Sequence, residues 1–420
     1  MADKLARRLQ GFDQPTVWHE FTPLANQHAA VNLGQGFPDW SAESFVKEAA
    51  KDALDADFNQ YARPQGHKKL VEVLAAKYSK ALGREIQWAD EVAVGVGATE
   101  TIYSAISAFV ESGDEVVILE PAFDIYQAQV QMAGGVCKFV PLHVRITGGV
   151  DGEKEFYVDE NTLAHAFSDK TRLVILNNPH NPTGKVFTRD ELELVAKYVR
   201  LHPRVTVVSD EVYEHITFDG KTHVRVANLD GMWERTLTVS SAGKTFSVTG
   251  WKVGWAIGPS NLVKGIHLAN NWIQFSVATP FQEAVANMLV RAEQEYKGFP
   301  TFYAFVADQY VQKRDRLAKA LLSVGITPVT PHGGIFLYSD ISAIKVPDEF
   351  LAPGMSYDWA FCRWLTITKG VTAIPTSAFF SDANKAEGHK WARFAYCKTD
   401  EAIAEAIKRL AALQTDEQQQ

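Results

Sequence analysis

The chain has 420 residues, of which 46% are hydrophobic and 22% are charged, and its formal net charge is −8. A chain of this length is too long to fold around one hydrophobic core of ordinary size. We therefore expect two domains, or one large domain with an appendage. The composition is typical of a globular enzyme, and the negative net charge argues against nucleic acid or an anionic membrane as the main partner.

The three cysteines are scattered along the chain, at Cys137, Cys362 and Cys397. Their odd number and wide spacing fit neither a disulfide framework nor a zinc site, so we expect a reducing compartment and no bound metal. The first ten residues lack the apolar core of a secretion signal, and no run approaches 18 apolar residues. We therefore expect a cytoplasmic protein, with a mitochondrial presequence left open by Arg7 and Arg8.

The first part of the chain, residues 1–45, is expected to be an irregular arm that joins a small domain, because Pro15, Pro23 and Pro38 prevent long helices. Within it, residues 33–39 read LGQGFPD. Its two glycines indicate either a close backbone approach or a simple turn. Apolar residues at helical spacing then predict helices over 43–54 and 67–82.

From residue 91 onward, short β-branched runs alternate with helical stretches such as 99–111 and 189–201. Strands spaced in this way need crossover connections, so the pattern predicts an α/β fold with a mostly parallel sheet and helices on both faces. We assign residues 46–298 to this large domain. The expected strands are 91–95, 115–119, 172–176, 205–209, 235–240 and 253–257.

After Pro280 the chain becomes strongly helical and then mixed, and residues 299–420 are expected to form a smaller α+β domain. The last five residues, 416–420, are polar and are expected to form a frayed end. The expected helices are 281–297, 302–323, 357–369 and 399–413, and the expected strands are 333–340 and 391–397.

Residues 95–100, GVGATE, follow a strand and open a helix. They miss the dinucleotide fingerprint, because Glu100 stands where its third glycine should be. A glycine turn at a helix start still presents free N–H groups to a phosphate, from Gly97, Ala98 and Thr99. The alternative is an ordinary helix start capped by Thr99.

Two further motifs follow the next strands. Residues 120–126 read EPAFDIY, in which Phe123 either stacks on a planar ring or belongs to the core. Residues 177–184 read NNPHNPTG, whose prolines and glycine fix a rigid turn that directs the amide of Asn181.

The strand over 205–209 ends at the sequence DEVY, residues 210–213. A carboxylate at the exit of a buried strand is costly unless it is paired with a cation or hydrogen bonds. Asp210 is therefore either a helix cap or the partner of a cationic group, and Tyr213 follows it by three residues.

Residues 241–255 read SAGKTFSVTGWKVGW and place Lys244 in a turn rich in glycine, serine and threonine. A P-loop is excluded, because Thr238 occupies the position of its first glycine. The other interpretation is a Schiff-base lysine that holds an aldehyde cofactor, with Ser241 and Lys252 placed to reach an anion.

This segment resembles the pyridoxal-phosphate lysine motif of class I aminotransferases. Together with 33–39, 120–126, 177–184 and RFAYCK at 393–398, it extends a similarity to fold-type I aminotransferases over almost the whole chain. The kynurenine aminotransferase and glutamine transaminase K group is the most similar. The resemblance implies a large domain with a mostly parallel seven-stranded sheet flanked by helices, plus a smaller α+β domain.

The resemblance also implies pyridoxal 5′-phosphate as cofactor and a role for each motif. Lys244 would form the Schiff base, Asp210 would pair with the protonated ring nitrogen, and Tyr213 and Asn181 would reach the ring oxygen. Phe123 would stack on the ring. The phosphate would be held by Gly97, Ala98, Thr99, Ser241, Lys252 and, from the partner subunit of a homodimer, by Tyr61.

For the substrate, the resemblance implies that Arg393 binds the α-carboxylate as a bidentate fork. Gly36 and Asn181 would line the same site, Trp18 and Tyr103 would form walls, and Phe275 would come from the partner subunit. Ser276 replaces a histidine that is frequent in the mammalian members, and Gly97-Ala-Thr replaces a Gly-Gly-Tyr-type turn.

The expected activity is ping-pong transamination between a 2-oxo acid and an L-amino acid of aromatic, kynurenine, glutamine or methionine type. Lys244 would act as the general base, while Asp210 keeps the ring nitrogen protonated. A cysteine-S-conjugate β-lyase stays open, since the same carbanion can expel a leaving group. A non-catalytic sensor would need a basic DNA-binding domain upstream, and too little chain precedes residue 91 for one.

Overall fold

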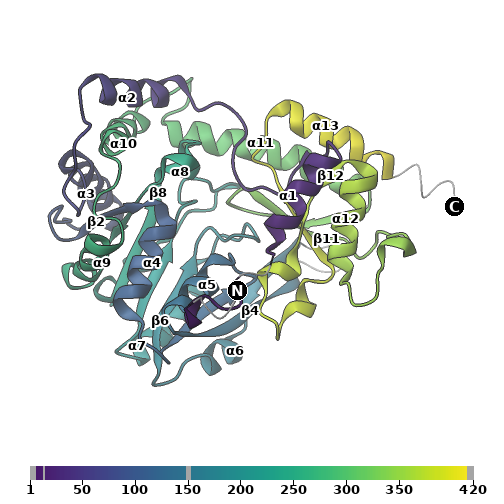
Figure 1. The fold of residues 1–420 in the computed structure, drawn as a ribbon, viewed down its shortest axis with the longest axis horizontal. Helices are drawn as coiled ribbons and strands as arrows, with labels where there is room; N and C mark the ends of the chain where they lie inside the picture. Colours follow the sequence, from purple (N-terminus) through teal and green to yellow (C-terminus); the bar gives the residue numbers. More distant parts are fainter. Residues whose placement is uncertain (1–5, 13–14, 148–152, 414–420) are drawn as a thin grey trace.

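The computed structural model describes residues 6–12, 15–147 and 153–413. Within these ranges the chain folds into a large sheet with helices on both faces and a smaller lobe, as Figure 1 shows. The expected frayed end at 416–420 lies outside the described residues. None of the helices in the described ranges is long and apolar enough to cross a membrane.

The large sheet has eight strands in the order β2-β9-β8-β7-β6-β3-β4-β5. Strand β9 is antiparallel to both of its neighbours, β5 is antiparallel to β4, and all other pairs are parallel. The expected mostly parallel sheet is therefore confirmed. The strands are β2 (Val92–Val96), β3 (Glu115–Glu120), β4 (Val136–Thr147), β5 (Glu153–Val158), β6 (Thr171–Asn177), β7 (Thr206–Asp210), β8 (Thr236–Ser241) and β9 (Val253–Ile257).

The expected number of seven strands is corrected to eight. Strand β4 runs for 12 residues, pairing first with β3 and then with β5, which returns as the edge of an antiparallel hairpin. Both strands escaped the sequence analysis because most of their residues are only partly buried, so they carry no continuous apolar run.

Alternate residues of the central strands enter two separate cores, as expected for a sheet covered on both faces. Val116 and Ile118 of β3 pack with α4 (Gly97–Phe109), α5 (Ile125–Met132) and α9 (Ser260–Ile273). Val117 and Leu119 pack with the opposite group, α6 (Glu160–His165) and α7 (Arg189–Leu201). Further helices α2 (Ser44–Asp55), α3 (Lys68–Leu82) and α10 (Thr279–Ala292) contribute buried side chains to a third core.

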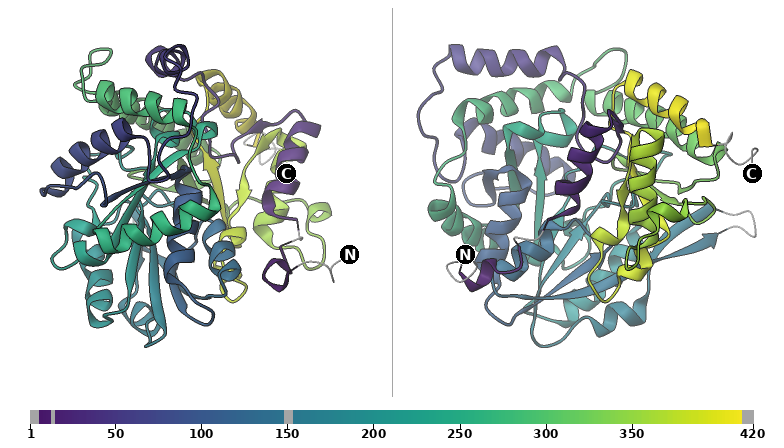
Figure 2. Two further views of the ribbon diagram at one scale, coloured as in Figure 1. Left: turned by 60° about the vertical axis from the view of Figure 1, so that its left-hand side comes forward. Right: turned by 45° about the vertical axis from the view of Figure 1, so that its right-hand side comes forward.

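The smaller lobe contains a four-stranded antiparallel sheet of order β10-β11-β14-β13. The amino-terminal arm lies against the helices of this lobe (Figure 2). A parallel strand pair, β1 with β12, joins the arm to the lobe. Its strands are β1 (Val31–Asn32), β10 (Thr327–Val329), β11 (Phe336–Asp340), β12 (Val371–Thr372), β13 (Ile374–Pro375) and β14 (Trp391–Ala395). Its helices are α1 (Val17–Gln27), α11 (Phe302–Ser323), α12 (Tyr357–Lys369) and α13 (Asp400–Leu410).

Short helical turns complete the fold and connect the longer elements. They are α8 (Ala242–Thr245) and the 3-10 turns Arg7–Leu9, Val226–Asn228, Trp233–Arg235, Thr249–Trp251, Asp348–Phe350, Thr376–Phe379 and Lys385–Gly388. The division into an arm at 1–45, a large domain at 46–298 and a small domain at 299–420 stays a prediction.

Two helix expectations were wrong. The arm is not irregular throughout, because α1 is an 11-residue helix with Pro23 inside it. Its residues Val17, Phe21 and Ala25 are buried at a spacing of four, and this apolar stripe offsets the backbone hydrogen bond that proline cannot donate. The helix expected over 281–297 is α10, which ends at Ala292.

Candidate active site

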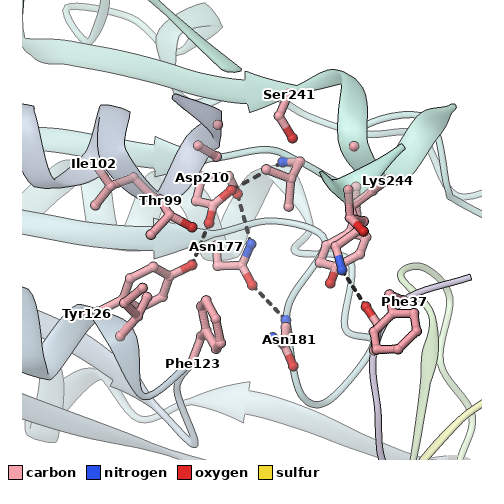
Figure 3. Close-up of a pocket in the computed structure, with 18 of the residues that line it drawn as sticks. Phe37, Thr99, Ile102, Phe123, Tyr126, Asn177, Asn181, Asp210, Ser241 and Lys244 are labelled. Atoms are coloured by element: carbon pink, nitrogen blue, oxygen red, sulfur yellow. Dashed lines mark hydrogen bonds between the residues drawn. The ribbon is translucent and has the colours of Figure 1, made fainter. Parts of the chain in front are cut away.

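A cavity of about 460 Å³ lies where the carboxyl ends of the large-sheet strands meet the arm and the small lobe. Figure 3 shows the side chains that line it. Thirteen sequence-predicted residues line this cavity, and three do not: Tyr61, Tyr103 and Phe275. The thirteen are Trp18, Gly36, Gly97, Ala98, Thr99, Phe123, Asn181, Asp210, Tyr213, Ser241, Lys244, Lys252 and Arg393.

One end of the cavity is suited to an anion. Helix α4 begins there at Gly97, whose φ of +74° is left-handed. The ammonium of Lys252 lies over the first turn, so closely that a Cβ at Gly97 would be 2.9 Å from its Nζ. A helix N-terminus and a lysine together can bind a phosphate group. Thr99 is the third residue of α4, so the interpretation of Thr99 as its cap was wrong.

Glycines also permit close backbone packing on both sides of the cavity. A Cβ at Gly254 would lie 2.4 Å from the backbone nitrogen of Ala98, and a Cβ at Gly36 would lie 2.4 Å from the ring of Phe336. The two-glycine motif in residues 33–39 therefore indicates a close backbone approach rather than a simple turn.

Lys244 is carried by the short helix α8, directly after β8. Its Nζ donates a hydrogen bond of 2.5 Å to the carbonyl oxygen of Gly36 and lies 5.8 Å from the ring centre of Tyr213. Burial lowers the pKa of Lys244 to about 8. A larger share of the amine is then neutral near pH 7, as a nucleophile or general base requires.

Asp210 ends β7 and is buried. Its Oδ2 accepts a 2.6 Å bond from the hydroxyl of Tyr126, and its Oδ1 accepts a 3.2 Å bond from the Val212 N–H. Burial raises the pKa of Asp210 to about 6, which these bonds partly oppose. No helix begins after Asp210 in the described part of this segment, so the cap interpretation was wrong. A cationic partner in the cavity would favour the ionised carboxylate.

Asn177 and Tyr126 are site residues that the sequence analysis missed. Asn177 donates to the Asp210 backbone carbonyl at 2.9 Å and accepts from the Asn181 N–H at 2.6 Å. Both appear beside Asp210 in Figure 3. Each stands in a motif already singled out, Tyr126 three residues after Phe123 and Asn177 four residues before Asn181, and that position was the available signal.

The opposite wall presents a buried guanidinium. Arg393 of β14 donates from Nη1 to Asn181 Oδ1 at 3.1 Å and from Nη2 to the Gly34 carbonyl at 2.7 Å. Its Nε is buried without a hydrogen-bond partner among the described residues. Burial lowers the pKa of Arg393 to about 10, and no carboxylate of the described chain forms an ion pair with it. Such a group is suited to an incoming anion.

Aromatic rings enclose this guanidinium. Its centre lies 4.0 Å from the ring centre of Phe336, 4.8 Å from that of Phe379 and 5.3 Å from that of Trp18. The indole of Trp18 donates in turn to Asp124 at 3.1 Å. The wall is therefore apolar apart from one cation.

The residues expected from a partner subunit lie on the surface, away from the cavity of their own chain. Tyr61 is 82% exposed and Phe275 is 51% exposed, and their ring centres are 5.2 Å apart in an edge-on contact. Ser276 donates to the backbone carbonyl of Ala62 at 3.1 Å. Tyr103 lies on α4, where Ile102 lines the cavity in its place.

Comparison with known proteins agrees with this geometry. A family model described as aminotransferase class I and II matches residues 29–410. Kynurenine–oxoglutarate transaminase of Dictyostelium discoideum is 45% identical over 414 residues, covering 95% of this chain and 94% of that protein. Kynurenine–oxoglutarate transaminase 3 of Mus musculus is 42% identical over 410 residues, covering 97% and 90%. YbdL of Escherichia coli, whose structure and reactivity identify a methionine aminotransferase function, has a TM-score of 0.86 and 35% identity, covering 97% of this chain and 99% of that one.

Proposed function

This chain belongs to the aminotransferases of classes I and II, and we propose that it moves an amino group between an L-amino acid and a 2-oxo acid with pyridoxal 5′-phosphate as cofactor, in a ping-pong sequence. The observation that carries this proposal is the meeting of Lys244, Asp210, Lys252 and Arg393 in one cavity. Each of these four side chains has a charge that the cofactor or an amino acid can complement.

The residues present fit this cofactor. Lys252 and the start of α4 suit its phosphate, Phe123 offers a ring for stacking, and Asp210 needs a cationic partner such as a protonated ring nitrogen. Lys244, with its lowered pKa, suits an aldehyde. When bound, the cofactor supplies a carbonyl carbon that links to amines and a ring that accepts the electron pair left by a departing proton.

The side chains of this chain then perform the remaining tasks. Arg393 binds the α-carboxylate of the amino acid and thereby orients its α-hydrogen. The Nζ of Lys244 takes this proton and later returns it, and the pKa of about 8 suits it to both directions. The carboxylate of Asp210 holds a proton on the ring nitrogen, and Tyr126 positions that carboxylate.

The cavity favours an amino donor with an uncharged side chain. Its charged lining residues in the described chain are Asp210, Lys244, Lys252 and Arg393, of which the first three serve the cofactor. A single cation is left for one substrate carboxylate, and the remaining wall is aromatic. We therefore propose donors of aromatic, kynurenine, glutamine or methionine type, in line with the names of the relatives.

A panel of amino donors, each assayed against several 2-oxo acids, tests this function. We expect phenylalanine, kynurenine, glutamine and methionine to be converted at least about tenfold more efficiently than aspartate, because its second carboxylate would lie unpaired in an aromatic wall. Pyruvate formed from a cysteine S-conjugate without an added oxo acid would instead show β-lyase activity. A preference for aspartate would contradict the assignment of the aromatic wall.

We further propose a homodimer in which Tyr61 and Phe275 complete the partner subunit's cavity. Besides these two rings, α9 exposes three apolar side chains, with Trp272 89%, Leu268 55% and Ile273 44% exposed. Exposed apolar area of this kind is typical of a subunit interface.

Mixing two impaired variants, Tyr61→Ala and Lys244→Ala, tests the shared site. Under conditions that exchange subunits, some mixed dimers carry one cavity with both residues intact, and we expect activity to return. If dimers exchange and no activity returns, while Tyr61→Ala alone is strongly impaired, Tyr61 does not serve the partner subunit.

A further inference from the structure

A buried ion cluster that the chemistry above does not use lies next to the cavity. It consists of Arg225 and two carboxylates, Glu211 and Glu214, and the imidazole Nε2 of His223 also lies 2.8 Å from Glu211 Oε2. The guanidinium donates from Nη1 to Glu211 and from Nη2 to Glu214. Glu211 is fully buried, Glu214 is 6% exposed and Arg225 is 9% exposed. One arginine therefore bridges two carboxylates away from water, and only its planar fork can reach both.

The two carboxylates alternate along the chain with two cavity residues. Asp210 and Tyr213 line the cavity, while Glu211 and Glu214 follow each of them and bind Arg225. Glu211 also donates its backbone N–H to the Val239 carbonyl of β8 at 2.7 Å. The segment over 210–214 is thus held by the cluster at the residues next to those that face the cofactor site.

The same cluster reaches two further strands that carry cavity residues. Glu214 Oε1 accepts a 2.7 Å bond from the Ser240 hydroxyl, and Ser240 directly precedes Ser241 and the Lys244 turn. The same oxygen of Glu214 accepts a 2.8 Å hydrogen bond from the Tyr78 hydroxyl. The Trp255 indole donates to that hydroxyl at 3.0 Å, and Trp255 lies three residues after Lys252. One carboxylate group therefore connects the segments that carry Asp210, Tyr213, Lys244 and Lys252.

Stability alone is a poor explanation for this arrangement. Desolvating three charges costs several kcal/mol per ion, and apolar residues of similar volume often give equal or better stability. A fully bonded polar cluster instead fixes one geometry, because each donor and acceptor accepts few alternatives. In a catalytic site this matters, since a displacement of about 1 Å can reduce the rate about a hundredfold.

We propose that Arg225 is a positioning residue for the reaction. By binding Glu211 and Glu214, Arg225 fixes Asp210 and Tyr213 relative to the Lys244 turn. Asp210 can then reach the ring nitrogen of the cofactor and Tyr213 its ring oxygen while Lys244 reaches the aldehyde carbon. This proposal rests on the transamination function proposed above, and it adds a requirement outside the cavity.

Arg225→Lys tests the proposal, because lysine keeps the charge and loses the fork. The matched control is Arg314→Lys. Arg314 is similarly buried, at 6% exposed, and binds both oxygens of Asp219. Neither Asp219 nor the other partners of Arg314, Asp315 and the Pro331 carbonyl, line the cavity. We expect both variants to melt at a lower temperature than the wild type. Only Arg225→Lys should lower kcat, by about tenfold to a hundredfold, with KM for the donor nearly unchanged.

A second readout is independent of turnover. The visible absorption band of the bound cofactor should titrate at a shifted pH in Arg225→Lys and at the wild-type pH in Arg314→Lys. If the two variants lose similar stability while kcat and the titration of Arg225→Lys match the wild type, Arg225 is structural only and the proposal fails.

Tyr78→Phe decides the matter if Arg225→Lys does not fold. It removes one donor to Glu214 and the acceptor of Trp255 while keeping the ring, so we expect the same changes at a smaller size, about threefold to tenfold in kcat. Wild-type kinetics and titration in Tyr78→Phe would overturn the proposed connection. A wild-type protein without activity or a cofactor band would refute the proposed function itself, so the two failures are distinguishable.

Discussion

The two walls of the cavity differ in how their charges are held. The wall formed by the large sheet carries Asp210, Lys244 and Lys252, whereas the wall formed by the arm and the small lobe carries Arg393 as its one charged side chain within the described residues. Asp210 is fixed by hydrogen bonds from Tyr126 and Val212. Arg393 keeps its Nε unbonded and lies among aromatic rings.

This difference indicates two kinds of ligand. The first wall has several fixed charges of both signs, which suits a resident group with a phosphate and a ring nitrogen. The second wall offers one cation in apolar surroundings, which suits a carboxylate that arrives and leaves. The walls touch through Lys244 and Gly36 and through Arg393 and Asn181, so the two ligands would meet there.

Replacing Lys244 should have the largest effect. Lys244→Ala removes the amine that we propose binds the cofactor covalently and moves the proton, so we expect no measurable transamination while the circular dichroism spectrum persists. Lys68→Ala, on an exposed side chain of α3, serves as the control and should keep wild-type turnover. Wild-type turnover in Lys244→Ala would show that the reaction centre lies elsewhere.

Asp210→Asn should follow, with a loss of at least about a hundredfold in kcat. The amide keeps the size of the carboxylate and loses the charge that, in the proposed function, would hold the ring nitrogen protonated. Steady-state kinetics and the cofactor spectrum measure the effect. An unchanged rate would mean that Asp210 is only a structural acceptor for Tyr126, and that the large-sheet wall holds its ligand without it.

Arg393→Lys tests the second wall separately. Lysine cannot reproduce the bidentate fork, so we expect kcat/KM to fall about tenfold to a hundredfold, mainly through KM. Retention of the cofactor, measured by dialysis and absorbance, should stay at the wild-type level. Loss of the cofactor from this variant would break the distinction between the two walls.

Tyr126→Phe should have the smallest effect, about threefold to tenfold in kcat, because only one hydrogen bond, from a neutral hydroxyl to Asp210, is lost. That bond favours the ionised carboxylate, so its removal should raise the pKa of Asp210 further above its ordinary value. In the cofactor-free protein, the pKa of Asp210 is about 6 in the folded state and about 3.8 in the unfolded state. The contribution of Asp210 to the free energy of unfolding is therefore fully present below about pH 3.8 and is lost as the pH rises through about 6.

Melting curves of the cofactor-free protein between pH 4 and pH 8 test this sign. The loss attributable to Asp210 should begin near pH 3.8 in both proteins and extend to a higher pH in Tyr126→Phe than in the wild type. Asp210→Asn should abolish it in both backgrounds. Superimposable curves would show that Tyr126 does not tune Asp210.

The parts that sequence predicted well are those that carry their own local pattern. Strand ends followed by motifs placed Asp210, Asn181 and Lys244 in one cavity, because parallel strands deliver their carboxyl ends to the same edge. Asn177 and Tyr126, the amide and hydroxyl partners of Asp210, were missed because no local pattern marks them. Tyr126 meets Asp210 across 84 positions, and no periodicity relates them.

The same limit applies to the fold. The sequence pattern could not anticipate α1, since the packing of Phe21 and its neighbours outweighs the proline inside the helix. It missed β5, an edge strand without an apolar run. The cluster around Arg225 joins residues from five separate segments, and its geometry exists only after the chain has folded.

Covalent trapping tests the central assignment most directly. The purified enzyme, loaded with pyridoxal 5′-phosphate, would be reduced with borohydride, digested and mapped by mass spectrometry, with Lys244→Ala treated in parallel. We predict a reduced pyridoxyl phosphate group on Lys244 in the wild type and no stoichiometric label in the variant. A label on another lysine, or an active wild type that carries none, would contradict the account of this cavity.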